Sequence, residues 1–433
     1  MEPASGLDRF RPASRYSVTE AEPDTMVTMS NPSRSFDRLE TVLAAALVTA
    51  AGGIYLNTLP LIVGAVADQF HWDETQLGLY AASGLMGTTL ATLTAPFWIR
   101  RWRWRMTIRI ASVSGMLGWI LISQLQTFVP IVLCAFVVGA LISVAYAPAF
   151  ACVSDASDPN RSIGIMIVAQ VLVAAAFSMA LPLVVSRFAL EGVFLALAFA
   201  SAAPIGLSHF LPDQGRIRIA ESKSMENSAG ARSRLSGMTF ALVGMLLFYT
   251  ALIGVWGFLE LIGNEAQVAD EDVALAVAVA LVVGLIGAIA AVAMSGRIPQ
   301  FIAILLGGAG LISSLILLEQ AEGFALYLLA AIGMNASWNF SMSYQIGLIA
   351  MLDSTGRFTV LVTAMQSIGG FVGPLLAGLV ATQRDYGSVM MMGIAATIFS
   401  LAAYAMAARF RAKADREDEN SKLGEAALEQ LTT

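Results

Sequence analysis

The sequence predicts an all-α integral membrane protein with twelve membrane-spanning helices in two six-helix halves. Three observations support this fold class. Hydrophobic residues make up 57% of the 433-residue chain and charged residues 13%, whereas a soluble domain has roughly 45–50% and about 25%. Apolar segments recur at close to the ~20 residues that a spanning helix needs. An internal repeat relates the first set of segments to the second.

The first element is a polar tail, residues 1–37, in which Pro, Ser and Arg are scattered among acidic residues. Such a composition cannot bury enough apolar surface to fold on its own. It also lacks the apolar core of a cleaved signal peptide. We therefore expect a disordered cytoplasmic tail.

Twelve apolar segments follow, separated by short polar breaks. The expected helices are Glu40–Val66, Gln76–Ile99, Thr107–Leu125, Pro130–Val153, Ile163–Ser186, Gly192–Leu211, Met238–Ile262, Val273–Met294, Gln300–Leu318, Phe324–Leu352, Phe358–Val380 and Gly387–Met406. The longest internal polar segment, residues 212–236, separates the sixth helix from the seventh. We expect a first half over 38–211, a central cytoplasmic loop over 212–236, a second half over 237–410 and a C-terminal cytoplasmic tail over 411–433.

The positive charges predict the orientation in the membrane, because Lys and Arg accumulate in cytoplasmic loops. All of the 25 Lys and Arg residues except Arg187 and Arg384 fall in one alternating set of loops and tails. The opposite loops are acidic. We therefore expect a multi-pass protein of the cell (inner or plasma) membrane with both termini in the cytoplasm.

The internal repeat appears when the fourth and fifth helices are compared with the tenth and eleventh. In each half a Tyr precedes an Asp by nine residues, and an Arg precedes a Gln by nine. These pairs are Tyr146/Asp155 and Tyr344/Asp353, then Arg161/Gln170 and Arg357/Gln366. Gly84 and Gly87 of the second helix also match Gly284 and Gly287 of the eighth. Because both copies keep the same sidedness, we expect parallel repeats about an axis along the membrane normal.

Two six-helix halves, a basic loop after the second helix, a long central loop and cytoplasmic termini together resemble the major facilitator superfamily. The resemblance covers about Glu40–Arg411. The family's loop motif, G-x-x-x-D-R-x-G-R-R, is only partly kept, because Arg100 and Arg103 match it but Ile99 replaces its aspartate. In the second half Ser295-Gly296-Arg297 again lacks the acid. The resemblance implies a secondary transporter with its substrate site near the midplane, between the halves.

The drug-antiporter branch of that family is poorly matched. Its arginine four residues before a glycine in the fourth helix is Ala135 here, ahead of Gly139. Its glycine-rich signature in the fifth helix is represented only by Pro182. The sequence therefore indicates the fold but not this subclass.

Polar and aromatic side chains inside apolar segments are the candidates for a substrate cavity, because such groups are costly in a membrane. They are Asn57, Tyr80, Tyr146, Gln170, Tyr249, Trp256, Asn335, Trp338, Asn339, Met342 and Gln366. At about 100° per residue, most of those in the tenth helix share one face. The alternative is that they join neighbouring helices by hydrogen bonds worth about 0.6 kcal/mol each.

Glu260 is the one acid inside an apolar segment away from the cytoplasmic ends. Burial favours the neutral form of a carboxyl, so Glu260 is the candidate for proton coupling. The alternative is an interfacial acid, because the seventh helix is expected to end only two residues later.

Six charged residues at the cytoplasmic ends are candidates for a gate that replaces the missing motif aspartate. They are Arg100, Asp155, Arg161, Arg297, Asp353 and Arg357. In this hypothesis the acids pair with Arg100 or Arg297 when the cytoplasmic side closes. Ordinary helix capping is the alternative.

These observations predict a secondary active transporter that moves a small organic solute by alternating access, coupled to protons. Without a fixed cation in mid-helix, a neutral, weakly charged or cationic solute is favoured. A membrane sensor that kept the fold is the alternative.

We expect no enzyme activity and no cofactor or metal, because His71 and His209 lie near helix ends and Cys134 and Cys152 share one apolar segment. The lipid bilayer is the expected environment, nucleic acid is not an expected partner, and the functional unit is expected to be a monomer.

Overall fold

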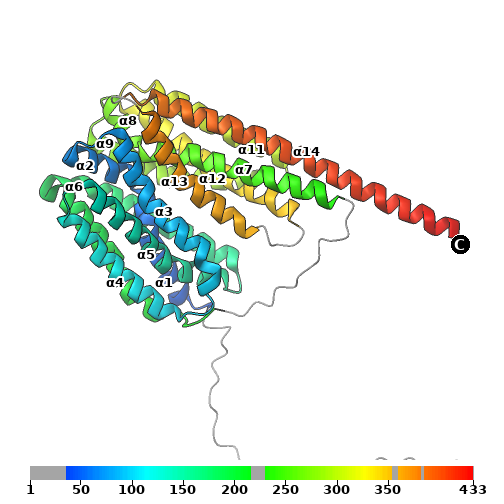
Figure 1. The fold of residues 1–433 in the computed structure, drawn as a ribbon, viewed down its shortest axis with the longest axis horizontal. Helices are drawn as coiled ribbons and strands as arrows, with labels where there is room; N and C mark the ends of the chain where they lie inside the picture. The colour runs from blue at the N-terminus through cyan, green and yellow to red at the C-terminus, as the bar shows by residue number, and fades with distance from the viewer. Residues whose placement is uncertain (1–35, 216–229, 354–358, 382–384, 433) are drawn as a thin grey trace, which may run out of the picture.

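A computed structural model describes residues 36–215, 230–353, 359–381 and 385–432 (Figure 1). Most of the predicted N-terminal tail, the middle of the predicted central loop, the candidate gate residue Arg357 and Arg384 lie outside these ranges. In Figure 1 the first half, in blue to green, lies beside the second half, in green to red.

Long helices make up both halves. The first half contains α1 (Leu39–Asn57), α2 (Leu59–Phe70), α3 (Glu74–Trp98), α4 (Trp104–Gln124), α5 (Phe128–Ser154), α6 (Pro159–Leu207) and the short 3-10 helix η2 (Ser208–Phe210). The second contains α7 (Ala231–Gly257), α8 (Leu259–Glu265), α9 (Asp270–Val283), α10 (Leu285–Met294), α11 (Gln300–Glu319), α12 (Phe324–Leu352), α13 (Thr359–Val380) and α14 (Gly387–Thr432). In the described part of the chain, nine helices are long and apolar enough to cross a membrane. The predicted all-α membrane fold is confirmed.

Several expected helices are divided or joined in ways that the hydropathy pattern did not indicate. The first expected helix breaks at Thr58 (φ −103°, ψ 11°) and the seventh breaks at Phe258 (φ −104°, ψ 5°). Pro60, which has no N–H group, follows the first break. The eighth expected helix divides at Gly284, and the fifth and sixth run together in α6 through a non-helical residue, Ala189 (φ 50°, ψ −152°). The first and seventh helices therefore break at equivalent places with nearly the same backbone angles.

The glycines of the internal repeat lie at helix crossings. A Cβ at Gly87 would overlap the carbonyl oxygen of Phe136, and a Cβ at Gly287 would overlap that of Ala336. The sequence separation is 49 residues in both halves. Without a side chain at these positions, α3 can approach α5, and α10 can approach α12, to backbone contact. The two halves are therefore assembled in the same way at this crossing.

The two halves meet through α3 and α13, through α6 and α9, and through α2 and α8. Thr75 Oγ1 donates a hydrogen bond to the carbonyl oxygen of Gly378 (3.2 Å), and a Cβ at Gly78 would lie 2.8 Å from Gly378 Cα. These contacts lie near the end that carries the acidic loops, which we call the acidic end. In Figure 1 the halves approach each other around α2, α8 and α9 and diverge toward the opposite, arginine-rich end. The structure is therefore closed at the acidic end.

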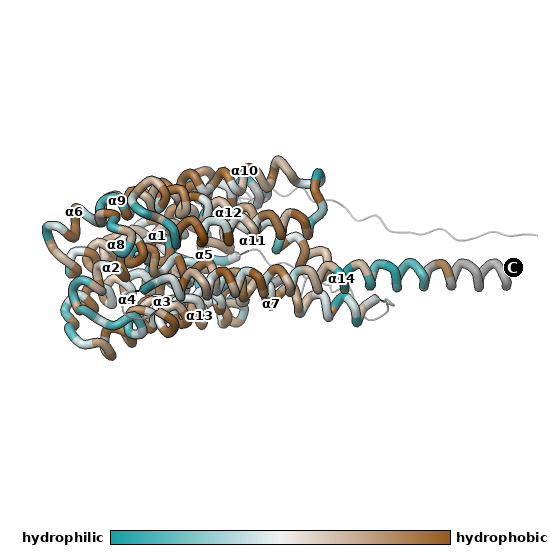
Figure 2. The backbone as a smooth tube through the Cα atoms, turned by 90° about the horizontal axis from the view of Figure 1, so that it is seen from above, coloured by the Kyte–Doolittle hydropathy of each residue, from teal (hydrophilic) through white to brown (hydrophobic). Residues whose placement is uncertain are grey.

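The last helix continues well past the membrane segment that the sequence predicts. α14 has 46 residues, and Figure 2 shows its apolar first part followed by a hydrophilic part that runs beyond the bundle. Arg234 Nη2 lies 2.8 Å from Asp418 Oδ2, and Ser233 Oγ donates to Glu417 Oε2 (2.7 Å). The C-terminal extension therefore begins as a helix tied to the start of α7.

Candidate functional site

Three of the candidate cavity residues in the first half come together around α1. Gln170 Nε2 of α6 donates to the Tyr146 hydroxyl of α5 at 3.3 Å. A Cβ at Gly53 of α1 would lie 3.4 Å from Asn57 Nδ2 and 3.8 Å from Gln170 Oε1. Asn57, Tyr146 and Gln170 are half-buried. We call these three residues the first-half cluster.

A second cluster lies in the other half, on α7, α12 and α13. The Tyr249 hydroxyl accepts hydrogen bonds from Trp338 Nε1 (3.2 Å) and from Gln366 Nε2 (2.9 Å). The Tyr249 and Trp338 rings meet edge to face with centroids 6.3 Å apart. A phenolic oxygen that accepts two bonds still has its own proton to donate. We call Tyr249, Trp338 and Gln366 the second-half cluster. They form one hydrogen-bonded group in which the Tyr249 hydroxyl proton remains able to donate.

The two clusters occupy equivalent places in the repeat, because α1, α5 and α6 correspond to α7, α12 and α13. The repeated glutamines, Gln170 and Gln366, each donate to a tyrosine hydroxyl. The tyrosines, however, are not the repeated pair. Tyr344, the sequence counterpart of Tyr146, instead donates its hydroxyl to the carbonyl oxygen of Ala291 (3.0 Å). In both halves the glutamine amide thus donates to a tyrosine hydroxyl. That tyrosine lies on α5 in the first half and on α7 in the second.

The polar face expected on the tenth helix divides in two. Asn339 Nδ2 donates to the carbonyl oxygens of Asn335 (3.0 Å) and of Gly284 (3.4 Å), where α9 gives way to α10. Asn335 is 2% exposed and packs its Cβ toward Gly284. These two amides contact the helix break, whereas Trp338 belongs to the second-half cluster. Met342, one turn further along α12, is half-buried.

Tyr80 and Trp256 lie elsewhere in the core. Tyr80 is fully buried and packs edge-on against Trp72, with ring centroids 6.0 Å apart. Trp256 is 2% exposed and its Nε1 donates to the carbonyl oxygen of Leu56 at 3.1 Å. That bond joins α7 to the end of α1, beside both helix breaks. Trp256 is therefore part of the contact between the halves.

Glu260 lies in α8, directly after the break at Phe258, and only 6% of it is exposed. It packs against α2 of the other half, where a Cβ at Gly64 would overlap its side chain. Its Oε2 atom has no hydrogen-bond partner among the described residues. An ionised carboxylate buried without a partner is unfavourable by several kcal/mol, so this site favours the neutral carboxyl.

The candidate gate residues are placed in different local settings. Arg100 and Asp155 form a two-bond ion pair, with Nη1–Oδ2 at 2.6 Å and Nη2–Oδ1 at 3.1 Å, which joins the ends of α3 and α5 inside the first half. Arg161 is exposed at the start of α6. Arg297 donates to the carbonyl oxygen of Ala293. Asp353, 8% exposed, caps the end of α12.

The Arg100–Asp155 pair connects two residues that the gate hypothesis named, but it connects them within one half. Its guanidinium also lies 5.9 Å from the Trp104 ring. The idea that these charges form a gate between the halves stays a prediction.

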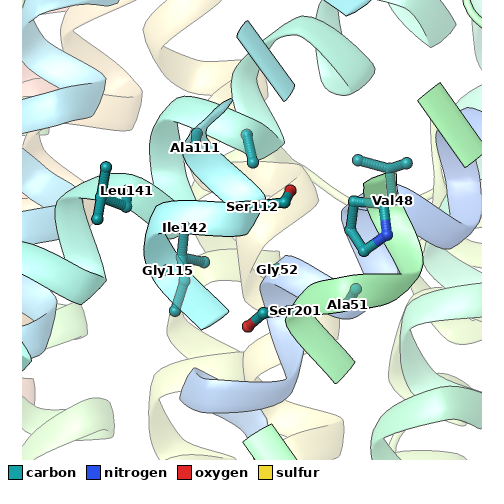
Figure 3. A pocket seen from close by; sticks show the side chains of 11 residues that line it. Val48, Ala51, Gly52, Ala111, Ser112, Gly115, Leu141, Ile142 and Ser201 are labelled. Atoms are coloured by element: carbon teal, nitrogen blue, oxygen red, sulfur yellow. The ribbon is translucent and has the colours of Figure 1, made fainter. Parts of the chain in front are cut away.

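A partly open pocket within the first half is separate from both clusters (Figure 3). It lies between α1, α4, α5 and α6, and small apolar residues and two serines, Ser112 and Ser201, line it. None of the candidate cavity residues lines this space. Because it is bounded by one half only, it does not have the interdomain position expected of a substrate site.

The sequence did not indicate several residues that contact the candidate site residues. Gly53 and Gly64 allow side chains from other helices to approach, and the Leu56 carbonyl accepts the Trp256 bond. No pattern separates these glycines from the other 35 of the chain. Pro60 was the one available signal for the break at Thr58.

Comparisons with known proteins bear on the fold. No protein-family model matches the sequence. No curated protein matches it either. Solved structures do match. A bacterial homologue of the human lysosomal transporter Spinster, in an inward-facing and unoccupied conformation, superposes with a TM-score of 0.64 at 14% identity, over 90% of this chain and 98% of that one.

Two further solved structures have similar scores. The nucleoside transporter NupG gives a TM-score of 0.66 at 14% identity, over 85% of this chain and 98% of that one. A D-xylose-proton symporter gives a TM-score of 0.67 at 13% identity, over 83% of this chain and 96% of that one. All three are transporters rather than enzymes. The chain has the major facilitator fold that the sequence resemblance implied.

Proposed function

Starting from this major facilitator fold, we propose that the chain is a secondary active transporter. In this proposal it moves a small organic solute by alternating access and couples the movement to protons through Glu260. The observation that carries the proposal is the burial of Glu260, 6% exposed and with Oε2 lacking a hydrogen-bond partner among the described residues, in the contact that closes the acidic end.

The coupling follows from the different surroundings of Glu260 in two conformations. While α2 packs on α8, the carboxyl is buried and shielded from water, which favours its neutral form. When the acidic end opens, α2 withdraws and water reaches Glu260, which releases its proton to the solution at that end. In this proposal the carboxyl has taken up that proton from the opposite side before the acidic end opens. Proton binding thus favours the closed acidic end, and a proton gradient biases the exchange between the two states.

The two clusters are the proposed substrate contacts. They offer amide, phenol and indole groups on opposite halves: Asn57, Tyr146 and Gln170 on one, and Tyr249, Trp338 and Gln366 on the other. These groups form hydrogen bonds and ring contacts without carrying charge. They suit a neutral, weakly charged or cationic solute. Two of the similar solved structures are named for a nucleoside and for D-xylose, which agrees with a solute of this kind.

The test begins by finding the solute. Metabolites in cells and in medium are compared with and without the expressed protein, and each difference is repeated in proteoliposomes with an imposed pH gradient. We expect at least one small organic solute to move in a gradient-dependent way. If no solute moves under either condition, the transporter proposal fails and the sensor alternative gains support.

Glu260→Gln then tests the coupling, because glutamine keeps the size of the side chain but cannot release a proton. We expect gradient-driven accumulation to fall at least about tenfold, while exchange of labelled for unlabelled solute continues. Glu322→Gln, which changes an exposed acid at the same end, is the matched control and should behave as wild type. Full gradient-dependent accumulation by Glu260→Gln would exclude the assignment.

A further inference from the structure

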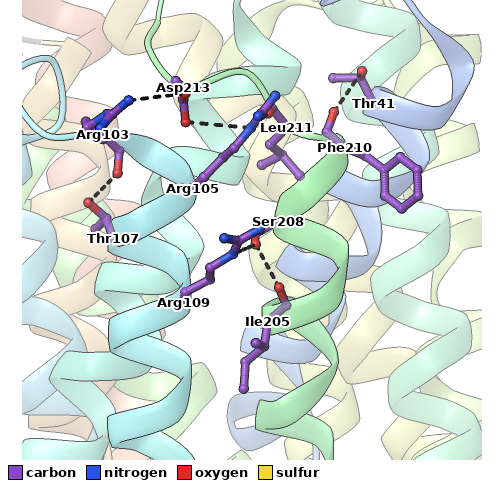
Figure 4. A network of polar contacts seen from close by, with 10 residues as sticks. All are labelled: Thr41, Arg103, Arg105, Thr107, Arg109, Ile205, Ser208, Phe210, Leu211 and Asp213. Carbon is purple, nitrogen blue, oxygen red and sulfur yellow. Dashed lines mark hydrogen bonds and ion pairs between the residues drawn. The ribbon is translucent and has the colours of Figure 1, made fainter.

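We propose that the first half binds the phosphate headgroup of an anionic phospholipid in a basic hollow at the arginine-rich end. The hollow lies between the start of α1, the start of α4 and the segment that follows α6 (Figure 4). It is separate from both clusters and from Glu260, so this inference does not depend on the proposed transport function.

Two adjoining spaces, both open to solvent, form the hollow, and they share Arg105 and His209. The remaining polar residues along them are Arg38, Glu40, Thr41, Arg103, Arg109 and Asp213. Four guanidinium groups therefore face two carboxylates. This excess of positive charge over one open space favours an anionic ligand.

The two carboxylates do not neutralise the four arginines fully, because Glu40 pairs with Arg38 (Nη1–Oε1, 3.4 Å) and Asp213 is the other acid along the hollow. Asp213 is shared, at 3.9 Å from Arg103 Nη2 and 3.6 Å from Arg105 Nε. Arg109 uses its Nε to donate to Ser208 Oγ (2.9 Å), which leaves four further N–H groups on its guanidinium. Phosphate oxygens are the acceptors that match such paired donors best.

The chain fixes these arginines in place. Arg105 Nε donates to the carbonyl oxygen of Leu211 (2.5 Å), and Trp104 N donates to that of Asp213 (2.8 Å). Thr41 Oγ1 of α1 donates to the carbonyl oxygen of Phe210 (3.1 Å). Figure 4 shows the contacts of Arg105 on α4 and of Thr41 on α1 with the segment after α6. A headgroup would therefore meet a prearranged site, which reduces the entropy lost on binding.

Exposed apolar side chains beside the arginines favour a lipid over a free phosphate. Met106 (58% exposed) lines the hollow from α4, Ile110 (55%) lies one turn further along that helix, and Phe210 (48%) lines it from η2. A molecule with an anionic head and acyl chains satisfies both kinds of surface, whereas inorganic phosphate satisfies only the basic one. Basic pockets beside spanning helices recognise lipid headgroups by this combination.

The experiment is native mass spectrometry of the full-length protein in mild detergent, titrated with phosphatidylglycerol or with phosphatidylcholine of the same acyl chains. We expect phosphatidylglycerol adducts to be retained preferentially. Arg103→Gln/Arg109→Gln should weaken their binding about tenfold or more, because each basic group near the surface contributes. Arg409→Gln/Arg416→Gln, which removes the same charge from exposed sites on α14, should have no effect.

A second variant keeps the test valid if the double substitution impairs folding. Asp213→Asn removes the competing carboxylate but keeps the backbone contacts of that residue, so phosphatidylglycerol should bind more tightly. Unchanged binding in both Arg103→Gln/Arg109→Gln and Asp213→Asn overturns the proposal. So does equal retention of the zwitterionic lipid, or displacement of phosphatidylglycerol by inorganic phosphate at equal concentration, which would indicate a site for a soluble anion.

Discussion

At the scale of single residues, the second-half cluster depends on one phenolic oxygen. Tyr249 accepts from Trp338 and from Gln366, so both donors depend on the same hydroxyl. Polarity inside an apolar segment was enough to select these three residues from the sequence. It was not enough to group them, because helix periodicity says nothing about which neighbouring helix supplies a partner. The matched spacings of Tyr146 and Tyr344 illustrate this, since their hydroxyls have different partners.

Tyr249→Phe is expected to raise the KM for the transported solute about tenfold, with the protein still folded. Two donors lose their acceptor, and each such hydrogen bond contributes about 0.5–1.5 kcal/mol. Transport assays in proteoliposomes measure the change. Tyr404→Phe is the control, because the Tyr404 hydroxyl is also buried but has no hydrogen-bond partner within the described ranges. Equal effects of the two substitutions would contradict a binding role for Tyr249.

At the scale of helices, breaks and glycine contacts decide where elements can move. α1 and α7 each break where α2 and α8 begin, and one of the contacts between the halves, that of α2 with α8, lies on those short helices. The sequence correctly predicted an all-α membrane fold, because the apolar segments have lengths that reflect the membrane thickness. It missed the breaks at Thr58, Phe258 and Gly284, because a helix can be interrupted locally while its hydropathy stays uniform.

Gly378→Ala is expected to weaken closure of the acidic end, because its Cβ would meet the backbone of α3 at Gly78 (Cα at 2.8 Å). Overpacking of this kind costs typically about 1–3 kcal/mol, a shift of fivefold or more between states. A reporter cysteine at Leu59, a buried position on α2, should then react faster with maleimide in a background without the two native cysteines.

The matched control for that measurement lies on the same helix. A Cβ at Gly370 of α13 has nothing within 4 Å, so Gly370→Ala should leave the reporter rate unchanged. Similar rates for Gly378→Ala and wild type would mean that the contact between α3 and α13 does not hold the end closed.

At the scale of the whole molecule, the contacts between the halves are related by the repeat. α3 corresponds to the α9–α10 segment and α6 to α13, so the contact of α3 with α13 and that of α6 with α9 are equivalent. Opening the acidic end must therefore break both together. The sequence repeat predicted two related halves, but sequence spacing alone carries no information about which end of the molecule is closed.

A cleavable bismaleimide that links Thr75→Cys to Leu379→Cys should stop transport, and reductive cleavage of the linker should restore it. Both positions are exposed, and Thr75 lies 3.2 Å from the Gly378 carbonyl oxygen in the other half. Uptake in proteoliposomes before and after cleavage is the measurement. Linking Asp37→Cys to Ser157→Cys, which lie together inside the first half, is the control and should leave transport intact. Continued transport by the Thr75/Leu379 conjugate would rule out rocking about this contact.

The helical continuation of α14 extends well beyond the rest of the second half and would move with it. From residue 407 to 432 it extends about 39 Å at 1.5 Å per residue, and i,i+4 pairs such as Arg411 with Asp415 and Lys413 with Glu417 stiffen its first turns. Because it is tied to α7, a tilt of the second half by about 10° would sweep its far end through about 7 Å. A fluorophore at that end would convert a small rotation of the second half into a larger displacement that can be measured.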